Sequence, residues 1–295
     1  MTLNPYFLNT TENERVLASK LIEDSRITEL PVDVALICRR QGWDLDFLEL
    51  ADTRDAYVEI SDYREISIVV NTSNTESNEG FSSSEVVRRR QRFSVAHEIG
   101  HAVMKSHDEK SFNCSIRRDG NPHFNLFHNN RESQANRFAS ELLIPQSHLS
   151  IHLKKFKWQF FFQSVEGLCD IFDVSLIACA VRVCKEAPFP ALCIFYDTDA
   201  KSRQIPGKSR DMNGLDFFIE SKSFIPKNTL VDDLANKPDF DGARKRYRNC
   251  KTWFPSSKDA ERFELEEQSM RIGKYGYITF LSFTERDDDE NWSKY

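Results

Sequence analysis

No run of eighteen apolar residues occurs in the sequence, so no membrane-spanning helix is predicted. The first residues lack a basic segment followed by an apolar stretch, and no signal peptide is expected. The seven cysteines include no pair with C-x-x-C spacing, which argues against a cysteine-rich zinc site. Their odd number, and the apolar runs in which most of them lie, are typical of reduced thiols in the cytoplasm. We therefore expect a cytoplasmic protein that is not bound to a membrane.

Basic residues are not in excess either, because 40 lysines and arginines are outnumbered by 46 acidic residues. The resulting net charge of −6 argues against direct nucleic-acid binding. The chain has the composition of a globular protein, with 40% hydrophobic and 29% charged residues. A length of 295 residues is enough for two domains and a sizeable core.

The most informative motif is His97-Glu98-Ile99-Gly100-His101, which has the form H-E-x-x-H. Residues four apart share one face of a helix, so His97 and His101 can present two imidazoles to one metal ion. Glu98 is turned about 100° from His97 and can act on a water molecule beside the metal. The pattern is typical of zinc peptidases, in which the metal polarises a carbonyl group and a glutamate takes the proton of water. An amphipathic core helix that carries two histidines by coincidence is the alternative.

The residues around the motif predict a helix. Ser82 and Glu85 have the spacing of a capping box, and no proline follows before Lys105. Apolar residues recur at helical spacing at Phe93, Ala96, Gly100 and Val103. Gly100 costs a helix about 1 kcal/mol relative to alanine. We therefore expect another backbone segment to approach the helix closely at Gly100.

A second predicted helix downstream offers a third metal ligand. Its apolar positions are Ala135, Phe138, Ala139, Leu142 and Leu143, and Pro145 ends it. Glu132 in its first turn can complete a His-His-Glu site with an open fourth position, as catalytic zinc requires. Asn136 lies one turn later and can hydrogen-bond a ligand imidazole. Glu141 is a second candidate near the helix end, and Glu132 could alternatively serve only to complement the helix dipole.

Zn²⁺ is the expected cofactor of such a site. A site of two histidines and one glutamate could also hold Mn²⁺ or Fe²⁺, because all three ions accept imidazole and carboxylate ligands.

The H-E-I-G-H motif followed by E-x-x-A-N-x-F-A-x-x-L-L-I-P resembles the ImmA/IrrE family of bacterial metallopeptidases, over roughly residues 10 to 185. The resemblance implies an α+β fold with a zincin-like, gluzincin-type core and zinc-dependent endopeptidase activity. It also implies that His97, His101 and Glu132 bind the metal and that Glu98 is the general base. Several members of the family cleave a helix-turn-helix repressor and thereby activate phage, mobile-element or stress genes. A repressor of this XRE type is the protein partner that the resemblance implies.

We divide the chain into a zincin-like peptidase domain at residues 1–146, a helical segment at 147–186 and a C-terminal α+β domain at 187–295. The helical segment resembles the helix-turn-helix-like region of the family, with inward positions at Leu168, Ile171, Val174 and Ala178. Because Arg182 is the one base-reading candidate there, we interpret the segment as a packing element. The C-terminal domain, expected to regulate or to dock substrate, has predicted strands at 191–196 and 277–283 and an alternating stretch at 262–268.

Two strands, 56–60 and 66–71, are predicted before the motif helix. In a zincin-like site the second of these strands can pair with an extended substrate backbone. The polar residues 72–84 that follow are interpreted as a solvated loop, with a flap over the cleft as the alternative.

The basic run Arg88–Arg92 lies on the motif helix, and we interpret it as the solvated face of that helix. Binding of nucleic acid or of an acidic patch on the substrate is the alternative. Between the two ligand helices, His107, His123 and His128 are candidates for stabilising an oxyanion, and their spacing does not select one of them.

These observations together predict a zinc endopeptidase. The alternative is a non-proteolytic regulatory protein that binds a repressor or DNA and in which the metal is structural.

Overall fold

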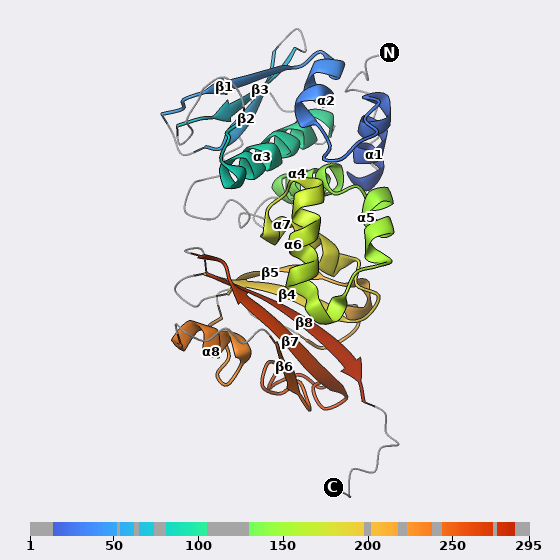
Figure 1. The fold of residues 1–295 in the computed structure, drawn as a ribbon, viewed down its shortest axis with the longest axis vertical. Helices are drawn as coiled ribbons and strands as arrows, with labels where there is room; N and C mark the ends of the chain where they lie inside the picture. The colour runs from blue at the N-terminus through green and yellow to red at the C-terminus, as the bar shows by residue number, and fades with distance from the viewer. Residues whose placement is uncertain are drawn as a thin grey trace, which may run out of the picture. The chain divides into compact units, whose positions relative to one another are not determined.

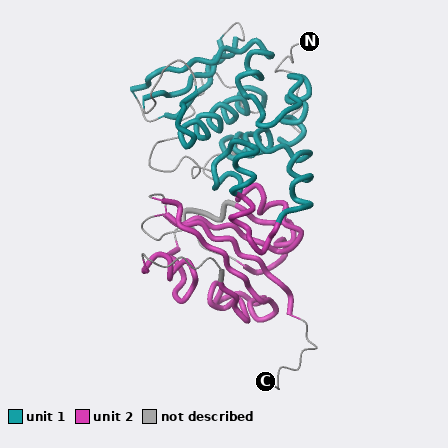
Figure 2. Tube along the Cα trace, in the orientation of Figure 1, with its two compact units in different colours: residues 1–156, 166–179 teal, residues 157–165, 180–295 magenta. Residues whose placement is uncertain are grey.

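The computed structural model describes residues 14–51, 54–61, 65–73, 81–104, 130–197, 202–217, 223–237, 244–273 and 276–286. The chain divides into one unit of residues 1–156 and 166–179 and a second of residues 157–165 and 180–295 (Figure 2). Both units contain helices and strands, so the fold class is α+β, as predicted. No helix in the described part of the chain is long and apolar enough to cross a membrane.

The first unit begins with two helices and a small sheet (Figure 1). Its first elements are α1 (Glu14–Asp24), α2 (Val34–Gln41), β1 (Asp44–Leu48), β2 (Ala56–Ile60) and β3 (Ile66–Asn71). The carboxylate of Asp33 accepts a hydrogen bond from the backbone N–H of Leu36 and so caps α2. Gly42, in the left-handed conformation at φ 72°, ends α2 and directs the chain into β1.

β3 is the central strand of this sheet, whose order is β1-β3-β2. It pairs in parallel with β1 and antiparallel with β2, so both of its edges are occupied. The predicted strands 56–60 and 66–71 are therefore confirmed, but the expectation that the second of them pairs with substrate is wrong. The prediction did not include β1, which fills one edge of β3 and leaves β2 at an edge of the described sheet.

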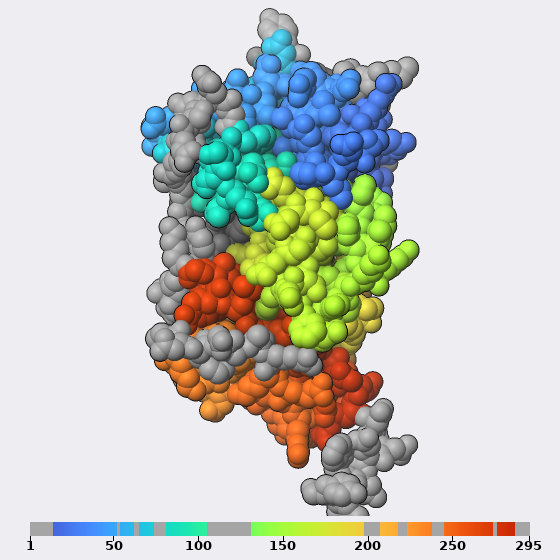
Figure 3. Space-filling model, viewed as in Figure 1, coloured from blue at the N-terminus to red at the C-terminus, as the bar shows by residue number. Residues whose placement is uncertain are grey.

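Two longer helices follow, α3 (Glu85–Val103) and α4 (Asn130–Leu143), and they pack against each other. Residues 91–103 of α3 are all buried, whereas its first six residues reach the surface, where Figure 3 shows them in teal. The helix starts after Ser84, so the predicted capping box at Ser82 is wrong. The backbone N–H of Ser82 instead donates to the buried side chain of Gln91, which holds the entry to the helix.

The helical segment contains α5 (Gln146–Leu153), the short η2 (Trp158–Phe160), α6 (Phe161–Phe172) and α7 (Leu176–Lys185). Three residues join α6 to α7, so a short turn connects the two helices. Leu168 and Val174 are buried as expected, but Ile171 is exposed. The turn begins at Asp173, which adopts a left-handed φ of 49°.

The arginines of α3 bind this turn. Arg88 donates two hydrogen bonds to the carboxylate of Asp173, at 3.1 and 2.9 Å, and Arg89 donates a third at 3.2 Å. Arg92 donates to the backbone carbonyl of Asp173 at 3.2 Å. Because the side chains of Arg89 and Arg92 are only 13% and 8% exposed, the interpretation of the basic run as a solvated face is wrong for them.

The second unit is built on a five-stranded antiparallel sheet of order β5-β4-β8-β7-β6 (Figure 1). The strands are β4 (Ala191–Tyr196), β5 (Ser202–Lys208), β6 (Arg244–Tyr247), β7 (Phe263–Arg271) and β8 (Tyr277–Glu285). The connection from β5 to β6 carries η3 (Arg210–Met212) and α8 (Leu230–Asn236). The predicted strands 191–196 and 277–283 are confirmed, and the stretch 262–268 lies mostly in β7. The core of this unit includes Leu192, Phe217, Trp253, Phe254 and Phe283.

We predict that Asp173→Asn destabilises the first unit by about 1–3 kcal/mol, because three arginines lose a shared, largely buried carboxylate. Burial opposes ionisation of Asp173, but the hydrogen bond from Arg88 and the charge of Arg92 outweigh it and lower the pKa of the carboxyl below 3.8. The stabilisation should therefore be complete above the unfolded-state pKa and disappear as the pH falls through the lower pKa of the folded state. Urea unfolding of both proteins across this pH range measures the difference.

The matched control is Asp170→Asn. Among the arginines of this cluster, Arg89 is the one whose described hydrogen bond reaches Asp170. The side chain of Asp170 is 79% exposed. The Asp170→Asn substitution should change the free energy of unfolding by no more than about 0.5 kcal/mol. Equal losses from the two variants would contradict the role assigned to Asp173.

Candidate metal centre

His97 and His101 lie one helical turn apart on the buried part of α3. Their Nε2 atoms are 3.0 Å from each other, and the residues are 0% and 2% exposed. The spacing follows from the α-helix, because positions i and i+4 stack on one face. The helix thus presents two imidazole nitrogens to one point in the interior.

Glu132 reaches the same point from the first turn of α4. Its carboxylate oxygens lie 3.1 Å from His97 Nε2 and 3.4 Å from His101 Nε2. The ligand atoms of these three residues all lie within 4.8 Å of one another. The alternative candidate, Glu141, lies elsewhere and accepts two hydrogen bonds from Arg15 of α1. The structure therefore brings together the three residues that the sequence analysis selected.

The arrangement fits a zinc ion. Tetrahedral zinc with ligands at about 2.0–2.1 Å requires ligand atoms about 3.3 Å apart. The two imidazole nitrogens are 3.0 Å apart, and the nearest Glu132 oxygens lie 3.1 Å from His97 and 3.4 Å from His101, through different oxygens of the carboxylate. These contacts are close to that value. Two neutral nitrogens and one carboxylate are also a donor set that catalytic zinc uses, with a fourth position left for water or substrate.

Asn136 stands behind His97, one turn after Glu132 on α4. Its side-chain oxygen lies 3.0 Å from His97 Nδ1. This oxygen accepts a hydrogen bond if Nδ1 carries the proton, which leaves the Nε2 lone pair free for a metal. The predicted contact between Asn136 and a ligand imidazole is therefore present.

The charges of these groups are strongly coupled. Burial opposes ionisation of Glu132, but hydrogen bonds to His101 and His97 and their charges lower the pKa of the carboxyl far below its ordinary value. Burial lowers the pKa of His101, whereas at His97 burial is outweighed by the hydrogen bond and the charge of Glu132, which raise the pKa of its imidazole. An ionised carboxylate beside a neutral imidazole is the protonation state in which both can bind a cation.

Glu98 is fully buried next to the cluster. Neither of its carboxylate oxygens has a hydrogen-bond partner within the described residues. Burial raises the pKa of Glu98 to about 7, although the charges of His97 and Arg54 oppose the rise. A buried carboxylate without partners is costly and is typical of a functional group that awaits a ligand or water.

The contact between α3 and α4 at Gly100 places Glu132 beside the histidines. A Cβ atom on Gly100 would lie 3.2 Å from Ala135 Cα and 3.0 Å from a ring carbon of Phe138. Only a glycine allows the two helix backbones to come this close. The expectation of a close backbone approach at Gly100 is confirmed.

The sequence analysis did not find the neighbours of Glu98 on and just before β2, because no local pattern links residues 54 and 58 to α3. α3 packs against β2 and β3, and this tertiary contact brings Val58 and Arg54 near Glu98. The three histidines proposed for an oxyanion, His107, His123 and His128, lie outside the described residues, as does most of the polar stretch 72–84.

Residues 81–160 match the Peptidase_M78 family, described as an IrrE N-terminal-like domain. The resemblance to the ImmA/IrrE family is thereby confirmed. A solved structure described as a Mycobacterium tuberculosis transcriptional regulator is similar, with a TM-score of 0.50 and 12% identity, over 92% of this chain and 76% of that one. At this identity the similarity concerns the fold alone. No curated protein matches the sequence.

We predict that Gly100→Ala weakens both folding and metal binding. The gain in helix propensity of about 1 kcal/mol is smaller than the overpacking cost of about 1–3 kcal/mol, because Ala135 backbone must move. The displacement separates Glu132 from the histidines, and zinc affinity should fall about tenfold or more. Thermal unfolding and competition with a zinc-chelating dye measure the two effects.

Gly167→Ala in α6 is the matched control. No heavy atom lies within 4 Å of a Cβ atom at that position. The control should be neutral or stabilising by up to about 1 kcal/mol, with unchanged zinc affinity. Normal zinc binding by Gly100→Ala would show that the close helix contact is not required.

Proposed function

Because residues 81–160 form an IrrE N-terminal-like domain, we propose that the protein is a zinc-dependent endopeptidase. The observation that carries this proposal is the convergence of His97, His101 and Glu132, with the buried and unpartnered carboxylate of Glu98 beside them. The three residues would hold the metal in a zincin-like, gluzincin-type core. A non-peptidase metal site would have no evident need for a buried Glu98 without hydrogen bonds.

In the proposed reaction Glu98 is the general base. A zinc ion would supply a Lewis acid that polarises the peptide carbonyl and acidifies water. The Glu98 carboxylate takes a proton from the attacking water and passes it to the leaving amine. Burial keeps the carboxylate free of competing partners, and Asn136 keeps His97 oriented toward the metal position.

We place the substrate backbone along β2 in this proposal. β2 is at the edge of the described three-stranded sheet and packs against α3, which carries Glu98. An extended segment added to that edge would run past the base and the metal ligands. This mode of binding selects unfolded or loop segments, because a folded helix cannot offer its backbone to a strand.

The substrate that we propose is a helix-turn-helix repressor of the XRE type, in the cytoplasm. The support for the substrate is the family resemblance of the metal-binding motifs. The support for the compartment is that the six cysteines in the described part of the chain form no disulfide and are buried. Cleavage of such a repressor would derepress the phage, mobile-element or stress genes that it controls.

We expect Glu132→Ala to lower zinc affinity by more than about 100-fold. Substitution of a residue that only hydrogen-bonds a metal ligand costs about 10–100-fold, and loss of a ligand itself should cost more. Elemental analysis of the purified protein and a zinc titration measure this effect. Glu141→Ala, which removes a carboxylate from the same helix, should bind zinc like the unmodified protein. Equal zinc occupancy in the two variants would remove Glu132 from the site.

Glu98→Gln should retain zinc and lose about 10²- to 10⁴-fold in cleavage rate, because the amide cannot accept the proton of water. The assay co-expresses the protein with a helix-turn-helix repressor encoded beside it and identifies the products by mass spectrometry. Cleavage should also be abolished by a chelator and restored by zinc. If the protein inactivates the repressor without cleaving it, and Glu98→Gln does so equally well, the result would support the non-proteolytic alternative.

A further inference from the structure

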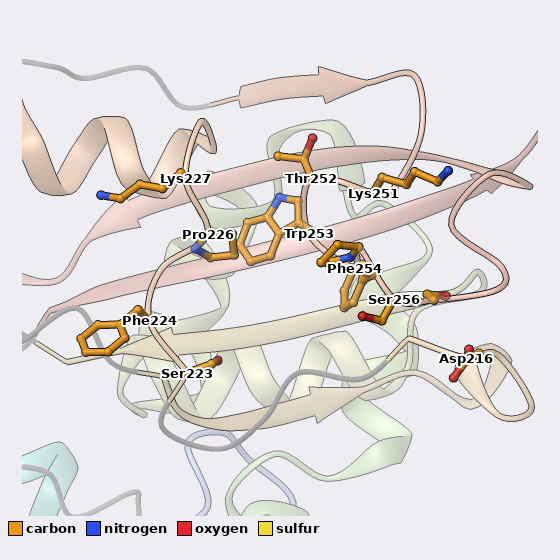
Figure 4. Close-up of a pocket in the computed structure, with 12 residues that line it drawn as sticks. Asp216, Ser223, Phe224, Pro226, Lys227, Lys251, Thr252, Trp253, Phe254 and Ser256 are labelled. Atoms are coloured by element: carbon orange, nitrogen blue, oxygen red, sulfur yellow. The ribbon is translucent and has the colours of Figure 1, made fainter.

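A cavity of about 740 Å³ lies in the second unit. Two segments form most of it, residues 223–227 before α8 and residues 251–257 between β6 and β7, and Asp216 completes the lining (Figure 4). Its volume is within the range of about 300–1,000 Å³ that is typical of small-molecule sites. The cavity shares no residue with the metal centre, and nothing in the proposed peptidase reaction uses it.

Flat apolar groups form the centre of the cavity. Figure 4 shows Pro226, Trp253 and Phe254 in the middle of the lining, with Phe224 at one end. Trp253 and Phe254 are 3% and 2% exposed, so their rings are anchored in the core, whereas Phe224 is 68% exposed. Aromatic surfaces of this kind favour a planar ring in offset-stacked or edge-to-face contact.

A buried carboxylate holds both segments in place. Glu267 on β7 is 0% exposed and accepts a hydrogen bond from the indole N–H of Trp253 at 3.3 Å. The same carboxylate accepts hydrogen bonds from the backbone N–H groups of Leu230 and Val231, at 2.9 and 2.8 Å, at the start of α8. One group therefore positions the ring of Trp253 and the segment that leads into α8. Such preorganisation reduces the entropy lost when a ligand binds.

The polar lining favours an anion. Lys227 and Lys251 come from the two segments, and hydroxyl groups such as that of Thr252 lie between them. Asp216 is the one acidic residue among the described lining residues, and its carboxylate already accepts a hydrogen bond from the backbone N–H of Lys258.

Both lysines form ion pairs directed away from the cavity centre. Lys227 pairs with Asp232 and Lys251 with Glu261, and the lysine side chains are 80% and 51% exposed. Exposed pairs of this kind contribute about 0–1 kcal/mol. A ligand anion can therefore compete for either ammonium group at little cost.

We propose that this cavity binds a small molecule that combines a planar ring with an anionic group. The ring lies against Phe224 and the edge of Trp253 that reaches the cavity, and a carboxylate or phosphate interacts with Lys227 or with Lys251. Aromatic carboxylates and mononucleotides share this chemistry.

The test measures binding of indole-3-acetate and of adenosine monophosphate to the zinc-loaded full-length protein. Indole and adenosine, which lack the anion, and inorganic phosphate, which lacks the ring, are the comparison probes. The signal is the indole N–H resonance of Trp253 in ¹⁵N-labelled protein, assigned with Trp253→Phe among the four tryptophans. The cavity shares no residue with the metal centre, so the cavity variants test the proposal independently of the proposed peptidase activity.

We expect at least one of the two anionic ring probes to bind at least about tenfold more tightly than its neutral counterpart, and phosphate not to bind measurably. Lys227→Gln, Lys251→Gln and Phe224→Ala should each weaken binding about fivefold, and these exposed substitutions should leave the fold intact. Lys208→Gln, which changes an exposed lysine of the same unit outside the cavity, should bind like the unmodified protein.

Binding of one probe alone would assign the cavity to aromatic carboxylates or to nucleotides, and either result supports the proposal. The proposal is overturned if neither probe shifts the Trp253 resonance at concentrations up to about 10 mM. It is also overturned if the neutral probes bind equally well, or if the cavity variants bind like Lys208→Gln.

Discussion

The close contact between α3 and α4 at Gly100 is the constraint on which the candidate metal centre depends. The H-E-x-x-H spacing alone supplies two imidazoles on one helix face, and a third ligand must come from another element. A Cβ atom at Gly100 would lie 3.2 Å from Ala135 Cα, so the two helix backbones are close together here. This closeness allows the short side chain of Glu132 on α4 to reach the histidines on α3. The absence of one side chain therefore fixes where Glu132 lies.

The other end of α3 is held by charge. Asp173, in the turn between α6 and α7, accepts hydrogen bonds from Arg88 and Arg89, and its carbonyl accepts one from Arg92. These arginines lie one to three turns before His97 on the same rigid helix. Apolar packing at one end and an ion-pair cluster at the other thus restrain the axis of α3, and a small shift of that axis would misplace both histidines.

Two buried carboxylates show how the same group serves different purposes. Glu267 in the second unit accepts hydrogen bonds from five groups, those of Leu230, Val231, Tyr247, Trp253 and Ser269. Its hydrogen-bonding capacity is fully used, so it acts as a structural anchor. Glu98 in the first unit accepts none from the described residues. Its capacity remains available for a proton, which is what a general base requires.

Local sequence patterns predicted the helices around the motif, the strands 56–60 and 66–71, and the choice of Glu132 over Glu141. Periodicity and spacing are sufficient for these features, because they involve residues within a few turns of one another. The strand order that puts β3 in the centre, the pairing of the basic run with Asp173 and the cavity beside Trp253 became visible in the folded chain alone. Each of these joins segments that are distant in the chain, and such contacts depend on the three-dimensional packing of whole elements, which no local pattern encodes.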